Sequence, residues 1–76
     1  MLKDERKTDS EKKQKILDKL LPALQETRAL SDLKELRYSE DPYGTVTAVF
    51  RKGMKKVNVD GDSGISMIRD VLKRIV

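Results

Sequence analysis

The chain has 76 residues, of which 37% are hydrophobic and 39% are charged, and its net charge is +4. A chain of this length closes one modest core, so two independent domains are excluded and either low stability or a homodimer is expected. The sequence has no histidine and no cysteine, which excludes a disulfide framework, a thiolate metal site and an imidazole base.

A charged segment opens the chain. Residues 1–7 are MLKDERK, and they have no apolar spacing that would repay the entropy of ordering. We therefore expect a flexible tail over 1–7 and one α+β domain over 8–76.

The first predicted element is a long helix. Thr8 and Glu11 have the spacing of a capping box, and the residues that follow place apolar side chains on one helical face. Pro22 interrupts this pattern without ending it, so a kinked helix that finishes by about Ala29 is expected. The apolar face comprises Ile16, Leu17, Leu20, Leu21 and Leu24.

The next segment, 33–39, has an ambiguous spacing. Leu33 and Leu36 are three residues apart, as on a helix, whereas Leu36 and Tyr38 alternate, as on a strand. The DPYG sequence at 41–44 is typical of a type I turn between two extended arms. This turn favours a strand over 33–39.

Two more strands are expected after that turn. TVTAVFR at 45–51 is rich in Thr and Val, a tight connection follows at 52–53, and MKKVNVD at 54–60 alternates polar and apolar residues. The side chains expected to face inward are Val46, Ala48, Phe50, Val57 and Val59.

A second helix is predicted from Ser63 to Ile75, with apolar residues every three or four positions. These residues are Ile65, Ile68, Val71, Leu72 and Ile75. The predicted fold is therefore α+β with the order α-β-β-β-α, a three-stranded antiparallel sheet covered on one face by helices.

Residues 61–64 are Gly-Asp-Ser-Gly, the tetrad that carries the nucleophilic serine in trypsin-like proteases. Without histidine that triad is impossible, and a serine–lysine pair needs a buried lysine, which the spacing does not indicate. We therefore predict no catalytic residues, and expect Asp62 or Ser63 to cap the last helix while Gly61 allows the bend before it.

A cation loop is a second interpretation of the same segment, because Asp60, Asp62 and Ser66 are spaced somewhat as in an EF-hand. Val71 stands where the bidentate glutamate of that motif belongs. No metal site and no cofactor are predicted.

The basic excess concentrates at RKGMKK, residues 51–56. A tight turn presents such side chains to an anionic surface, so we expect nucleic-acid binding there, with Tyr43 stacking on a base. The alternative is that the lysines protect an edge strand from aggregation. The candidate nucleic-acid-binding residues are Arg51, Lys52, Lys55, Lys56, Arg69, Lys73, Arg74 and Tyr43.

The stretch from TVTAVF to DVLKRI resembles small accessory proteins of prophages and conjugative elements. That resemblance implies a small binding protein, since some of these proteins bind DNA and others inhibit a host protein such as a CRISPR nuclease. The element order also resembles the double-stranded-RNA-binding domain, but the last helix opens with GDSGIS and lacks the basic cluster of that family. No site is carried over from either resemblance.

The sequence thus predicts a small non-enzymatic binding protein, associated with DNA or RNA through the 51–56 hairpin. The alternative is a mobile-element inhibitor or adaptor that docks on a host protein. No apolar run is long enough to span a bilayer, and the absence of cysteine and of a secretory signal predicts a cytoplasmic protein.

Overall fold

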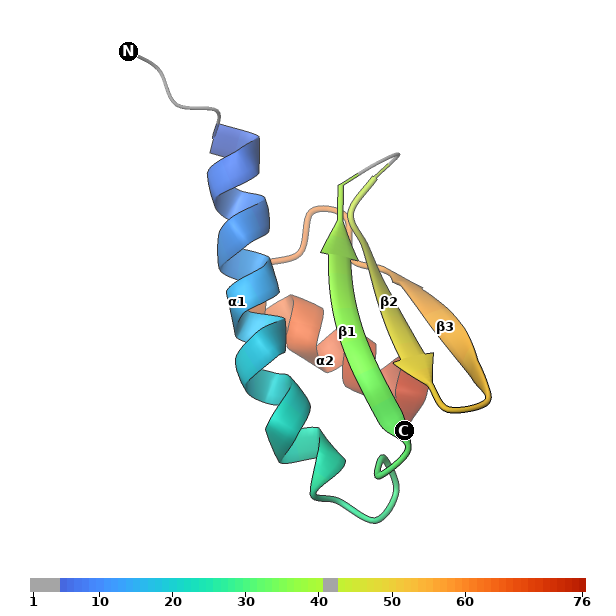
Figure 1. Ribbon diagram of the computed structural model, residues 1–76. Coiled ribbons are helices and arrows are strands. Elements are labelled where there is room, and N and C mark those ends of the chain that lie inside the picture. Colours follow the sequence, from blue (N-terminus) through green and yellow to red (C-terminus); the bar gives the residue numbers. More distant parts are fainter. Residues whose placement is uncertain (1–4, 41–42) are drawn as a thin grey trace.

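The computed structural model describes residues 5–40 and 43–76, and its element order is the predicted α-β-β-β-α (Figure 1). Both helices lie on the same face of an antiparallel sheet in which β2 is central. The predicted fold class is confirmed. The elements are α1 (Glu5–Gln25), β1 (Leu33–Ser39), β2 (Thr45–Phe50), β3 (Gly53–Asn58) and α2 (Gly64–Ile75).

Helix α1 begins at Glu5, so the predicted start at Thr8 is wrong. Thr8 lies inside the helix and is not its N-cap. Glu, Lys and Arg are good helix formers, which is why the first turn extends beyond the apolar face. Of the predicted tail, 5–7 are helical and 1–4 lie outside the described residues.

The helix continues through Pro22, as expected, and it ends at Gln25, within the predicted limit of about Ala29. Thr27 closes this end, because its backbone N–H donates to the Leu24 carbonyl at 3.0 Å and its hydroxyl donates to the same oxygen at 2.6 Å. The Thr27 hydroxyl also accepts from the Leu30 N–H at 3.3 Å. Residues 26–32 therefore form a turn that returns the chain to the sheet, with Leu30 buried.

Strand β1 covers the predicted 33–39, and its irregular apolar spacing has a structural cause. The pairing with β2 shifts between Leu33 and Glu35, as in a β-bulge. The extra residue places Leu33 and Leu36 on the same, buried face although they are three positions apart. The predicted type I turn that follows includes positions 41 and 42, which lie outside the described residues.

The register of the sheet separates its two faces. Val46 pairs with Val57, and Ala48 pairs with Leu36 on one side and with Lys55 on the other. Residues that are directly opposite each other share a face, so these positions all lie on the face that the helices cover. The opposite face is open and carries Thr45, Thr47 and Val49 along its central strand.

The two edge strands are protected in different ways. The Gln14 side chain donates to the Leu36 carbonyl at 3.0 Å and accepts from the Tyr38 N–H at 2.8 Å, and Gln25 donates to the Leu33 carbonyl at 3.0 Å. Helix α1 therefore occupies the polar groups along the free edge of β1. Strand β3 carries Lys55 and Lys56 instead, a common way to discourage edge pairing.

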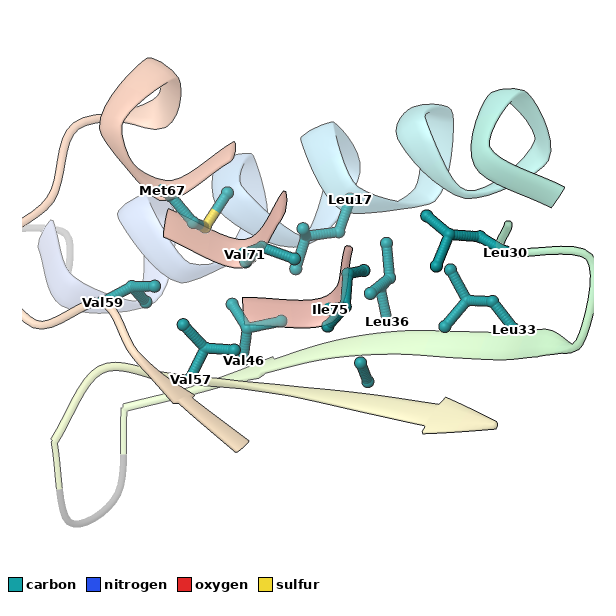
Figure 2. Packing of buried hydrophobic residues seen from close by; sticks show 11 residues of the cluster. Leu17, Leu30, Leu33, Leu36, Val46, Val57, Val59, Met67, Val71 and Ile75 are labelled. Carbon is teal, nitrogen blue, oxygen red and sulfur yellow. The ribbon is translucent and has the colours of Figure 1, made fainter. Parts of the chain in front are cut away.

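The core brings together side chains from both helices and all three strands (Figure 2). Leu17, Val46, Ala48, Val59, Met67 and Val71 are completely inaccessible to solvent. No helix in the described ranges is long and apolar enough to cross a membrane. The full buried cluster is Leu17, Leu30, Leu33, Leu36, Val46, Ala48, Val57, Val59, Met67, Val71 and Ile75.

Candidate nucleic-acid interface

Arg51 and Lys52 form the two-residue connection between β2 and β3, where Phe50 pairs with Gly53. Both side chains are exposed. The Arg51 N–H donates to the Asp32 carbonyl at 3.0 Å. This bond holds the hairpin turn against the 26–32 turn, so two segments distant in sequence share one end of the molecule.

Lys55 and Lys56 lie on opposite faces of the sheet, because neighbouring strand residues alternate. Lys55 pairs with Ala48 on the helix side, and its Nζ lies 5.9 Å from the centre of the Phe50 ring. Lys56 pairs with Thr47 on the open face. The four hairpin cations therefore do not form one patch, and Lys56 is separated from the others.

A hollow of about 390 Å³ lies between the hairpin, the 26–32 turn and the end of α2. Its wall is mixed, with apolar side chains beside one carboxylate and two lysine side chains. The lining residues are Ala29, Leu30, Asp32, Phe50, Lys52, Gly53, Met54, Lys55 and Ile75.

The last turn of α2 adjoins this hollow through Ile75. Lys73 and Arg74 occupy the same turn and are both exposed. These two predicted residues therefore lie at the same end of the fold as the hairpin turn. Arg69 lies one turn earlier, and its Nε is 4.0 Å from the Asp70 carboxylate, which separates it from the group.

Tyr43 is about half exposed and lies between β1 and β2. The hairpin turn is at the other end of β2, a strand of six residues that is roughly 20 Å long. Tyr43 is therefore too far from Arg51 and Lys52 to stack on a base held there. Tyr38, the other tyrosine, is half-buried, and its ring packs under the Lys13 ammonium group.

Arg28 was not predicted as a binding residue, because the sequence placed it near the end of the first helix. It is exposed within the 26–32 turn, next to residues that line the hollow. Six cations thus surround one end of the fold, which we call the basic end, and none of them forms an ion pair with any residue that the structure describes. The basic end comprises Arg28, Arg51, Lys52, Lys55, Lys73 and Arg74.

Comparison of the chain with protein-family models, curated proteins and solved structures found no match. The geometry of the site therefore carries the functional argument.

Several carboxylates lie at the opposite end of the fold. The Val59 N–H donates to the Gly44 carbonyl at 2.9 Å, which places the 59–62 segment beside the β1–β2 connection. Carboxylates gather at this end, among them Glu40, Asp60, Asp62 and Asp70. Lys12, Lys13 and Lys15 of α1 also lie near this end, so it carries charges of both signs.

The Gly-Asp-Ser-Gly segment lies at this end of the fold and contains the N-cap of α2. Ser63 has extended backbone angles, and its hydroxyl accepts a hydrogen bond from the Ser66 N–H at 3.2 Å. Gly61 adopts a φ of 80°, which lets the chain bend before the helix. Of the two predicted capping residues, Ser63 is the N-cap and Asp62 is not.

Asp62 instead faces another carboxyl group. Its Oδ2 is buried, and no donor in the described part of the chain reaches it. The pKa of Asp62 is raised because a protonated carboxyl here shares a hydrogen bond with Asp70, and desolvation and the charge of Asp70 act in the same direction. Arg69 and Lys13 oppose this rise.

Lys13 is a charged residue that the fold buries, with only 8% of its surface exposed. Its Nζ lies 5.2 Å from the centre of the Tyr38 ring, a cation–π distance. The expectation that no lysine lies in an apolar setting is therefore wrong. The sequence contains the spacing that predicts this burial, because Lys13 lies one helical turn before Leu17 and so shares its buried face.

No group of three or more acidic side chains within the described ranges is arranged to hold a metal ion.

Proposed function

We propose that this protein binds nucleic acid through its basic end and performs no chemistry on it. The observation that carries this proposal is the gathering of six cations, free of ion pairs within the described chain, at one end of the fold, where Lys52 and Lys55 line a hollow. A cation that already forms an ion pair with a carboxylate of the same protein binds phosphate weakly, whereas these six cations are available to phosphate.

The hollow adds a second kind of contact. Phosphates of a bound strand lie against Lys52 and Lys55 at its margin, and the half-buried Phe50 and the exposed Met54 in its wall receive a base or sugar surface. Asp32 is the one carboxylate in this wall. This arrangement favours a strand with accessible bases over a regular duplex.

Salt-dependent binding tests the proposal. Fluorescence anisotropy would be measured with labelled 20-nucleotide single strands of DNA and RNA, and with a DNA duplex, at several NaCl concentrations. The variant Arg51→Gln with Lys52→Gln removes two charges and suits the existing turn, because neither position has a positive φ. We expect the logarithmic salt slope on single strands to fall by about 1.4, since each lost phosphate contact contributes roughly 0.7.

The matched control removes two cations from the other end of the molecule. Lys12 and Lys15 are exposed on α1 near Gln14, whose side chain bonds to Leu36 and Tyr38 far from the hairpin. Lys12→Ala with Lys15→Ala should leave the slope unchanged. An equal fall in both variants, or no binding at 50 mM salt, would refute the proposal.

A further inference from the structure

Helix α2 has a wider apolar surface than the core uses. Met67, Val71 and Ile75 are buried against the sheet. Ile68 and Leu72 are only half-buried and lie outside the core cluster, and Ile65 is 76% exposed. One flank of the helix thus presents apolar side chains that the domain itself leaves uncovered.

This flank faces away from α1. Successive helical residues are separated by about 100° around the axis, so Asp70 and Leu72 lie on opposite flanks. Asp70 contacts Asp62, and the positive charge of Lys13 on α1 acts on the Asp62 carboxylate. Leu72 therefore projects from the other side. We call the residues of this flank the α2 stripe; they are Ile65, Ile68, Leu72 and Val76.

The charges beside the stripe are basic. Arg69 and Lys73 are exposed next to it, one helical turn apart. Asp70, the only acidic residue of α2, starts from the opposite flank, and its carboxylate lies 4.0 Å from the Arg69 Nε. Spacings of three and four residues between apolar positions are those by which a helix docks on a partner helix or groove. A partner that covers the stripe therefore needs apolar residues flanked by carboxylates.

A second copy of this chain does not meet that need. Two α2 helices that pair in an antiparallel arrangement bring Arg69 and Lys73 of both copies to the same flank, and these like charges repel each other. A membrane surface is also a poor fit, because the stripe has no aromatic residue to anchor it at the lipid interface.

We infer that the α2 stripe is a docking surface for an acidic amphipathic helix of a partner protein. The probe is a synthetic 21-residue peptide with Leu at heptad positions a and d and Glu at e and g. A control peptide carries Lys at e and g. Titration calorimetry with the full chain should show binding of the Glu peptide and at least about tenfold weaker binding of the Lys peptide.

Two sets of variants separate docking from folding. Leu72→Ser should weaken binding of the Glu peptide about tenfold or more, because it removes apolar area that docking would bury. Ala23→Ser, at an exposed position of α1, should leave binding unchanged, because the stripe faces away from α1. Arg69→Glu with Lys73→Glu should reverse the preference, so that the Lys peptide binds more tightly. A misfolded variant would bind neither peptide, so this reversal supports docking specifically.

Several outcomes would overturn the inference. They are failure of both peptides to bind, equal binding of both, binding that Leu72→Ser does not weaken, and absence of the reversal in the double variant. Two more would assign the stripe to another occupant: a dimer in analytical ultracentrifugation that Leu72→Ser dissociates, or binding to vesicles of anionic lipid that this substitution abolishes.

Discussion

Replacement of Ser63 by alanine tests how the loop before α2 is built. The Ser63 hydroxyl accepts from the Ser66 N–H at 3.2 Å, and the Ser63 carbonyl accepts from the Met67 N–H at 2.8 Å. Ser63→Ala removes the first of these bonds and keeps the second. The Ser66 N–H is one of the four at the helix start that lack a partner within the helix, so water must then satisfy it.

The expected cost is about 1 kcal/mol, the usual value for losing an N-cap side chain. For 76 residues the unfolding entropy near the midpoint is about 160 cal/mol/K, so this loss lowers Tm by roughly 6 °C. The domain has only about 4–11 kcal/mol of total stability at typical values per residue. A loss of this size is therefore readily measured.

Urea denaturation followed by circular dichroism gives the free energy, and calorimetry gives Tm. Ser63→Thr is the matched control, because it retains the hydroxyl and should recover most of the loss. The reasoning is refuted if threonine destabilises as much as alanine, or if Asp62→Ala costs as much as Ser63→Ala, since Asp62 is not the cap.

Three further substitutions test the core, the bend before α2 and the carboxyl pair. Leu17→Ala removes a side chain with no exposed surface and should cost about 3–5 kcal/mol in urea denaturation; a cost below 1 kcal/mol would contradict the described core. Gly61→Ala introduces a side chain at a φ of 80° and should cost about 1 kcal/mol, whereas Gly53→Ala meets open space at an ordinary φ and should change stability little. Folding raises the pKa of Asp62 above its usual 3.8, so the folded state binds the proton of this carboxyl group more tightly than the unfolded state does. The contribution of Asp62 to stability therefore grows as pH falls through the raised pKa, and it is constant below the pKa of the unfolded state. Asp62→Asn should therefore raise Tm relative to the natural chain more at pH 7 than at pH 3, and an equal shift at both would show that Asp62 does not titrate abnormally.

Local sequence patterns were sufficient to predict the helices and strands. The alternation of Val46, Ala48 and Phe50 predicts a strand with one inward face, and this face does contact the core. Ser63 was correctly placed at a helix start because capping depends on amides within three residues of it. These features depend on near neighbours along the chain, so the sequence contains the information that specifies them.

The missed features depend on residues that are distant in sequence. Lys13 is buried because the fold places Tyr38 beside it. Arg28 joins the hairpin because the Arg51 N–H bonds to the 26–32 turn, while Tyr43 is left at the other end of β2.

Only the tertiary structure decided which charges meet and which apolar side chains stay uncovered. The basic excess of 51–56 is visible in the sequence, but its division between two sheet faces follows from the pairing register of β2 and β3. In α2 the period of apolar residues predicts a buried face, yet Leu72 and Ile65 remain outside the core. The reason is geometric: a helix packed on a small sheet buries one side only, and contacts with the sheet and α1 determine which side that is.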